Sequence, residues 1–402
     1  MLFSFAVFIF VAMILSKCFE KLHMPPLLGM LFSGILLGQY SKDYFINEKG
    51  LTFLSSFFIS DKILDVSSEL RTLGLIIILI RAGLGIDKEV LAKIGKTAVK
   101  MASLPCLFEG FTVMFAAHYI LGYSFPIAGC LGFILAAVSP AVVVPEMLSL
   151  KEKGLGKEKE IPTIILAGAS IDDVFAITLF TAFLGMAMGQ GVNIVSEIGK
   201  IPLSILTGLG LGLLVGYILV KVFTMFHMRD TRKAIVFLMA AVMFHHIEEL
   251  KIFPIASLLG IMAIGFMILA KDGGLAKRLA LKFNKIWVFG EILLFVLIGA
   301  AVNIRVIFES GHMGVLIVII GLIGRFIGVT TALYNSNLNT KEKLFCGISY
   351  IPKATVQAAT AGIPLAMGVP HGDTILAIGV LAIIITVPVG VTGIRLGRDT
   401  LL

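Results

Sequence analysis

Five ionisable residues lie deep inside long apolar stretches of this 402-residue chain: Glu109, Asp172, Asp173, Arg325 and Lys353. An ionised side chain at the centre of a bilayer costs several kcal/mol, so such residues pair with one another or build a binding site. With all five ionised, three carboxylates face two cations, which leaves a net charge of −1. A carboxylate in a poorly solvated site holds either a proton or a monovalent cation, and the two compete. The set therefore predicts the chemistry of a cation/proton antiporter.

The adjacent aspartates are the strongest candidates for the ion site. Neighbours on a helix point about 100° apart, so one of Asp172 and Asp173 can face a cavity while the other faces a partner helix. Lys353 is the predicted counter-charge, and a desolvated lysine can release its own proton when a cation displaces its carboxylate partner. We interpret Glu109 and Arg325 as a structural ion pair, because neither charge can remain unpaired at that depth.

The composition places these residues in a membrane. The chain is 58% hydrophobic and 14% charged, with a mean hydropathy of +1.02. A soluble chain carries about a quarter charged residues, so a water-soluble enzyme, a nucleic-acid binder and a disulfide-stapled secreted domain are excluded. About 20 apolar residues are needed to cross the hydrocarbon region. Thirteen such runs lie near 2–19, 25–40, 70–86, 97–120, 126–149, 161–188, 201–222, 233–247, 252–270, 284–302, 313–334, 343–368 and 372–394.

The distribution of basic residues predicts the orientation. Most lysines and arginines fall in segments that face the cytoplasm if the N-terminus is outside, so the positive-inside rule gives an N-out, C-in topology. The stretch 41–69 is too broken by charges to span and suits an external loop with an interfacial segment. His245, His246, Glu248 and Glu249 resemble a metal cluster, but their place at the outer end of a span favours a solvated helix terminus.

The two halves of the chain look duplicated. The segment 27–38 is similar to 258–269, and 78–86 is similar to 296–304, which pairs spans seven apart along the chain. An odd offset inverts one copy in the bilayer, and inverted-topology repeats are typical of secondary transporters. We therefore predict an all-α membrane fold with inverted repeats.

The same offset pairs two spans that proline interrupts at mid-length. One break contains Ser139, Pro140 and Val143, and the other contains Pro352 and Thr355. Proline removes a helix donor, and irregular backbone at membrane depth lines a cavity or is buried in protein. We predict that the two broken helices cross and line the ion site.

With these residues in view, the sequence resembles the monovalent cation/proton antiporter superfamily, in its sodium/proton exchanger branch with paired aspartates. The segments that carry the resemblance are IRAGLGID (80–87), AAVSPAVVVPEM (136–147), AGASIDDVFAITLF (167–180) and IPKATVQAA (351–359). The resemblance implies that Asp173 is the principal ion-binding aspartate, that Asp172 is its lysine-paired neighbour and that Lys353 is the lysine of this branch. The best-known members carry their lysine on the tenth span instead of the twelfth, so their stoichiometry does not carry over.

The resemblance also implies an organisation and a setting. Residues 1–40 and 201–270 would form a dimerisation scaffold, and 70–188 with 284–396 a mobile ion-carrying core. The expected protein is a multi-pass homodimer in a bacterial inner (plasma) membrane. It would need no cofactor, would bind no nucleic acid, and would take Na⁺ or Li⁺ at Asp172 and Asp173 in exchange for H⁺.

Three alternatives remain open at this stage. A potassium/proton exchanger would share the same carboxylates, since a site with few other ligands discriminates poorly. A sodium-coupled organic-anion symporter would not need Lys353 opposite an aspartate pair. An intramembrane aspartyl protease needs two aspartates on separate helices, which adjacent residues do not supply. The two-proton, electrogenic scheme, in which Lys353 pairs with Asp172, is favoured only slightly over one-for-one exchange.

Overall fold

The computed structural model describes residues 2–22, 24–49, 52–85, 88–156, 158–188, 194–226, 228–250 and 255–402, and all regular structure in these ranges is helical. The α-helices are α1 (Leu2–Lys21), α2 (Pro26–Leu37), α3 (Gln39–Asp43), α4 (Asp61–Asp65), α5 (Ser67–Gly85), α6 (Lys88–Leu121), α7 (Phe125–Leu135), α8 (Pro140–Glu152), α9 (Ile161–Ala187), α10 (Ile194–Met225), α11 (Asp230–Glu249), α12 (Ser257–Lys271), α13 (Gly273–Ala300), α14 (Ile304–Ala332), α15 (Thr340–Ser349), α16 (Thr355–Thr360), α17 (Ile363–Ala366) and α18 (Gly372–Gly397). Two short helical turns, Tyr44–Glu48 and Thr52–Leu54, lie in the predicted external loop.

Within the described residues, each predicted apolar run overlaps helix, and both predicted breaks are confirmed. The first break separates α7 from α8, and the second separates α15 from α16. By length and composition, six helical segments within the described residues are able to cross a membrane: Leu2–Lys21, Val99–Leu121, Leu206–Met225, Gly273–Ala300, Gly311–Ala332 and Gly372–Gly397. The count of thirteen spans and the N-out orientation remain predictions.

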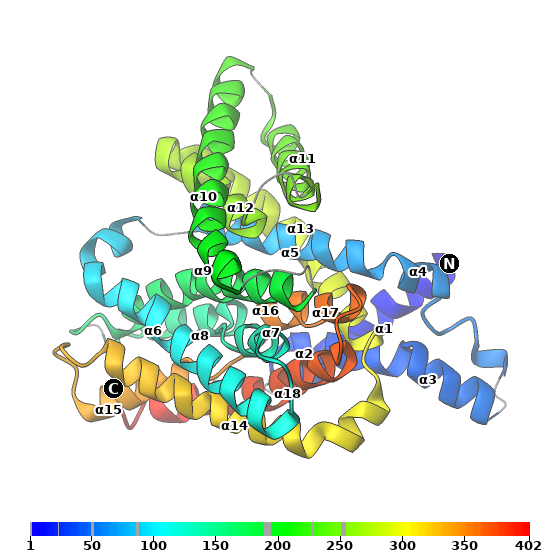
Figure 1. The fold of residues 1–402 in the computed structure, drawn as a ribbon. Helices are drawn as coiled ribbons and strands as arrows, with labels where there is room; N and C mark the ends of the chain where they lie inside the picture. Colours follow the sequence, from blue (N-terminus) through cyan, green and yellow to red (C-terminus); the bar gives the residue numbers. More distant parts are fainter. Residues whose placement is uncertain are drawn as a thin grey trace.

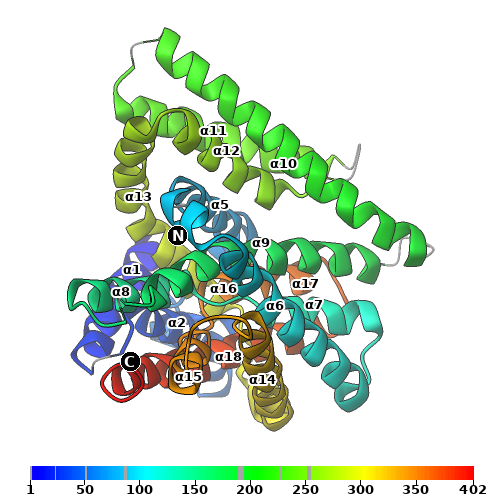
Figure 2. The same ribbon diagram turned by 90° about the vertical axis from the view of Figure 1, so that its left-hand side faces the viewer.

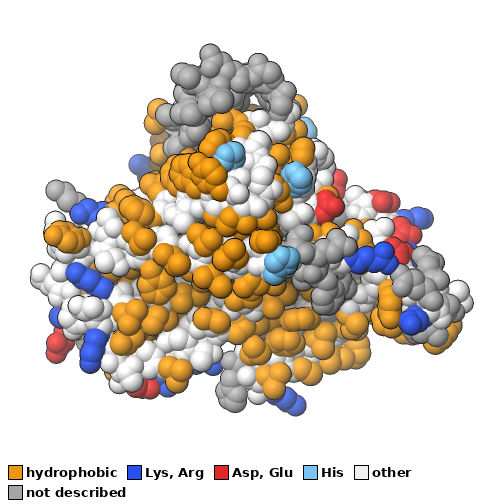
Figure 3. Space-filling view, turned by 60° about the horizontal axis from the view of Figure 1, so that its bottom comes forward, with side chains coloured by type: hydrophobic (Ala, Val, Ile, Leu, Met, Phe, Trp, Pro, Cys, Tyr) orange, Lys and Arg blue, Asp and Glu red, His pale blue; other side chains and the backbone are white. Residues whose placement is uncertain are grey.

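The helices gather into two groups on either side of α5. Figure 2 shows α10, α11 and α12 together at the top, with α5 beneath them and α6, α7, α14 and α18 below. Figure 1 shows the same group of three rising above the rest of the chain. The face in Figure 3 is covered by a broad area of hydrophobic side chains, with most of the charged ones toward its margins. Such a surface suits contact with lipid.

Glycines allow two helix pairs to pack backbone against backbone. A Cβ atom at Gly34 of α2 would overlap the carbonyl oxygen of Val296 in α13, and one at Gly83 of α5 would overlap that of Met262 in α12. Small residues let membrane helices approach closely where burial of apolar surface gives no extra attraction. The similarity seen in the sequence relates α2 to α12 and α5 to α13, so it would map the α2–α13 contact onto the α5–α12 contact, and each contact joins one half of the chain to the other.

Candidate functional site

The two helix breaks cross and are hydrogen-bonded to each other. The backbone N–H of Ser139, at the start of α8, donates to the carbonyl oxygen of Pro352 over 2.9 Å. The amide Nε2 of Gln357 in α16 donates to the carbonyl oxygens of Ile134 and Ala137, each at 2.9 Å. These bonds satisfy carbonyls at the end of α7 that no helix turn can reach. The breaks therefore form one crossing unit.

Asp172 and Asp173 lie on α9 beside this crossing. Both side chains are buried, with residue exposures of 0% and 6%. The Oδ2 atom of Asp172 accepts the backbone N–H of Val138 over 2.7 Å, which anchors it to the first break. The hydrogen bond from Val138 and the positive N-terminal end of α8 both favour a negative charge on Asp172.

Glu109 joins the remaining charges. Its Oε2 atom accepts a hydrogen bond from Nε of Arg325 and another from Nζ of Lys353, the latter over 2.5 Å. The Nη2 atom of Arg325 lies 3.5 Å from Oδ2 of Asp172. All these side chains are at most 2% exposed. The chain of contacts therefore runs from Lys353 through Glu109 and Arg325 to Asp172.

This geometry corrects the expected partner of the lysine. The ion-pair partner of Lys353 in the described structure is Glu109 on α6, and Asp172 is contacted by Arg325. The expected contact between Glu109 and Arg325 is present, but Lys353 shares it. The difference arises because a carboxylate oxygen has more than one acceptor site, so Oε2 of Glu109 accepts from both cations at once. The premise of the two-proton scheme, a direct Asp172–Lys353 pair, is absent from the described residues.

Several oxygens around the crossing have no protein hydrogen-bond partner within the described part of the chain. They are Oγ of Ser139, Oδ1 of Asp172, Oδ1 of Asp173, Oγ1 of Thr355 and Oε1 of Gln357. Carboxylate, carbonyl and hydroxyl oxygens are the ligands that hard cations prefer. The other predicted lining residues, Val143 and Pro352, are also buried, and Pro140 is partly so. The donor set thus fits a small monovalent cation or a proton.

Three residues of the site were not identified from the sequence. Gln357 ties the two breaks together. Tyr350 places its ring 5.6 Å from the guanidinium of Arg325, and Oγ1 of Thr386 in α18 accepts the backbone N–H of Lys353 over 2.9 Å. The sequence does contain a signal for Gln357, because a side-chain amide within an apolar, broken span seldom lacks a hydrogen-bond partner.

The histidine-rich terminus of α11 does not form a metal centre in the described residues. No group of three or more potential metal-ligating side chains is present among them. Nδ1 of His245 lies 2.8 Å from Oγ of Ser257. The side chains of Glu248 and Glu249 lie outside the described residues.

Comparisons with known proteins agree on one family. The sequence matches the family described as "Sodium/hydrogen exchanger, transmembrane" over residues 6–396. It is 32% identical to human "Sodium/hydrogen exchanger 9B2" over 388 residues, covering 91% of this chain and 68% of that protein. The mouse protein of the same name is 34% identical, with 91% and 66% covered. The fold is similar to that of the sodium proton antiporter MjNhaP1 from Methanocaldococcus jannaschii, with a TM-score of 0.83, 18% identity and coverage of 99% and 97% of the two chains.

Proposed function

The chain belongs to the sodium/hydrogen exchanger family, and on that premise we propose that it exchanges Na⁺ or Li⁺ for H⁺ by alternating access at the crossing of its broken helices. It is an integral multi-pass membrane protein of a transporter family, and we assign it no catalytic reaction. The scaffold of α1, α2 and α10–α12 and the core of the remaining long helices are part of this proposal. That the protein forms a homodimer and that it lies in a bacterial plasma membrane remain predictions from the resemblance.

One observation carries the assignment: the buried cluster has one carboxylate more than it has cations. Glu109 contacts Arg325 and Lys353, and Asp172 contacts Arg325 and the Val138 N–H. Asp173 is the carboxylate for which this network supplies no cation. One bound proton or one bound monovalent cation at Asp173 brings the cluster to neutrality, so the two ligands exclude each other.

The same network favours exchange of one cation for one proton. Because Lys353 is held by Glu109, a cation that arrives at Asp173 does not have to displace a lysine from its carboxylate. Lys353 then keeps its proton through the cycle, and each turnover carries no net charge. Solid-supported-membrane recordings on active protein should show no sustained Na⁺-induced current. A transport current that Lys353→Gln removes while exchange continues would contradict this stoichiometry.

The test of the function is proton flux in proteoliposomes. Asp173→Asn keeps the size of the side chain and removes its charge, so we expect it to abolish Na⁺- and Li⁺-driven proton flux while the protein remains folded. Asp399→Asn, a charge removal at the exposed C-terminal end of the chain, is the matched control and should exchange normally. Wild-type-like exchange by correctly inserted Asp173→Asn protein would refute the assignment. Proton flux driven by K⁺ but not by Na⁺ or Li⁺ would show that K⁺ is the transported cation.

A further inference from the structure

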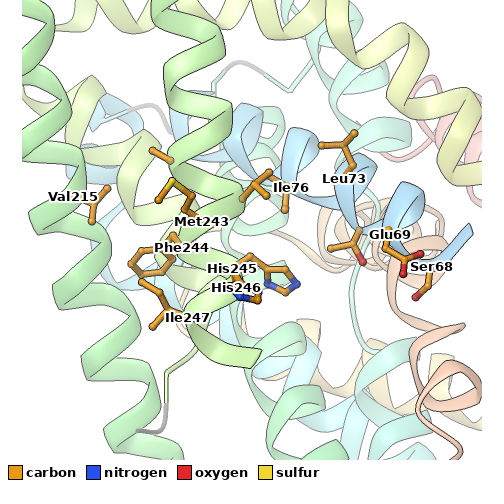
Figure 4. Close-up of a pocket in the computed structure, with 13 residues that line it drawn as sticks. Ser68, Glu69, Leu73, Ile76, Val215, Met243, Phe244, His245, His246 and Ile247 are labelled. Atoms are coloured by element: carbon orange, nitrogen blue, oxygen red, sulfur yellow. The ribbon is translucent and has the colours of Figure 1, made fainter. Parts of the chain in front are cut away.

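A cavity lies apart from the charged cluster, between α5, α10 and α11 (Figure 4). Its volume is about 830 Å³. The residues that line it include Ser68, Glu69 and Ile76 of α5, Val215 of α10, and Ala240 and His246 of α11. None of these residues belongs to the proposed ion site.

The lining of this cavity is divided into a polar and an apolar part. Figure 4 shows Ser68 and Glu69 at one side of the lining and Val215, Phe244 and Ile247 at the other, with His245 and His246 between them. Along α5 the polar residues come first, and Ile76 follows about 10 Å deeper than Glu69 at 1.5 Å per residue. Along α11, Ala240 lies about 9 Å deeper than His246. The cavity is therefore polar near the helix ends and apolar toward the middle of the membrane.

The rim of the cavity opens toward apolar surroundings. Val242 and Met243 are 41% and 68% exposed. Exposed aliphatic side chains within a long helix of a membrane protein face hydrocarbon. An occupant can therefore enter from the bilayer, with its apolar part directed toward the midplane and its polar part at the membrane surface. That is the orientation of a phospholipid in its own leaflet.

The charges at the polar end select the head group. The carboxylate of Glu69 favours a cation and disfavours an anionic head group, and the neighbouring hydroxyl of Ser68 accepts hydrogen bonds. His245 and His246 line the same end of the cavity, where Nδ1 of His245 lies 2.8 Å from Oγ of Ser257. We propose that this cavity binds one phosphatidylethanolamine molecule, whose primary ammonium contacts Glu69 and whose acyl chain fills the space beside Ile76, Val215 and Ala240.

The bound lipid would lie where the two proposed groups of helices meet. Helix α5 belongs to the proposed ion-carrying core, whereas α10 and α11 belong to the proposed scaffold. A lipid at this site fills space that side chains leave open beside α5, α10 and α11, so its acyl chain adds packing to the direct contact between α5 and α12.

Native mass spectrometry of the purified full-length protein tests the site. Phosphatidylethanolamine, phosphatidylcholine and phosphatidylglycerol with identical acyl chains would be added in equal amounts. The wild-type protein should retain one phosphatidylethanolamine about two- to fivefold more strongly than the other two lipids, the size expected of one partly exposed ion pair. Phosphatidylcholine separates the contribution of hydrogen bonding from that of charge, because its quaternary ammonium cannot donate.

Two variants address the two ends of the cavity independently. Glu69→Gln should remove the preference for phosphatidylethanolamine, whereas Asp65→Asn, a charge removal at the exposed last residue of α4, should keep it. Ala240→Phe fills the apolar end and should reduce retention of all three lipids. Equal retention of the three lipids by the wild-type protein would overturn the proposal. So would an unchanged preference in Glu69→Gln or undiminished retention in Ala240→Phe, since either indicates lipid bound elsewhere on the surface.

Discussion

Neutralising Glu109 is the sharpest test of the buried charge network. In the native protein its carboxylate contacts both Arg325 and Lys353, whose side chains are 0% and 1% exposed. Glu109→Gln keeps the size and leaves two buried cations that share Asp172 alone. Removing one partner of a buried ion pair costs about 3–5 kcal/mol, because the remaining charge stays desolvated. We expect a loss of stability of that size and weakened cation binding, since the cluster is then neutral before any cation arrives.

The size of the thermal effect follows from the chain length. An unfolding entropy of about 2.1 cal/mol/K per residue gives about 0.8 kcal/mol/K for 402 residues. The unfolding midpoint in detergent should therefore fall by about 4–6 °C. The matched control is Glu146→Gln, which breaks a hydrogen bond of 2.7 Å to Arg395, a side chain that is 42% exposed. The Glu146 side chain is 17% exposed, but Arg395 reaches solvent, so we expect the pair to contribute about 1 kcal/mol and the control to shift by only about 1 °C.

A double variant separates charge balance from local damage. Adding Lys353→Met to Glu109→Gln leaves two carboxylates and one cation, which restores the net charge of −1. The double variant should lose less stability than the two single changes together, because each single change leaves a buried charge that the other removes. Additive losses in this cycle would refute the reasoning. So would a Glu109→Gln shift no larger than that of Glu146→Gln.

Two further predictions concern residues that support the site. Gln357→Leu removes both hydrogen bonds to the end of α7, so a loss of about 1–3 kcal/mol in unfolding free energy should accompany slower exchange in proteoliposomes; unchanged melting and flux would show that the crossing holds without it. In the first turn of α15, burial alone would raise the pKa of Glu342, but the hydrogen bonds from Lys159 and the Asn339 N–H outweigh it and the pKa is lowered. Because the folded state holds this carboxyl ionised to lower pH than the unfolded state does, its contribution to stability is present above the ordinary glutamate pKa and is lost as the pH falls through the lowered value. Glu342→Gln should therefore flatten the acid limb of the unfolding midpoint measured against pH, and an unaltered limb would contradict the assignment.

The breaks could be predicted from the sequence because their cause is local. Pro140 and Pro352 interrupt apolar runs at positions where no helix can continue unchanged, and the structure has breaks at both. The buried charges could be found for a similar reason, since a charge in an apolar run is conspicuous in any sequence. These charged side chains are buried in the fold because the apolar helices that carry them pack together.

The pairing of these charges could not be predicted in the same way. Glu109, Arg325 and Lys353 lie on α6, α14 and at the second break, and which cation reaches which carboxylate depends on the rotation of each helix about its axis. The position of each charge along its apolar run gives its depth in the membrane, and this places all five charges at one level. Depth does not determine how each helix is rotated about its axis. The role of Gln357 depends on the same geometry, because its amide meets carbonyls more than 200 residues away in the chain.

The glycine contacts at Gly34 and Gly83 restrict how this architecture can diverge in evolution. A leucine in a packed core can be exchanged for an isoleucine with compensation nearby. At Gly34 and Gly83, however, a neighbouring carbonyl occupies the place of a Cβ atom, so no other residue fits there. Lineages of this fold should therefore vary by extension at termini and loops and by substitution on lipid-facing surfaces, while α2–α13 and α5–α12 keep their spacing. The human relative, of whose length this chain covers 68%, should accordingly carry its additional residues outside these two contacts.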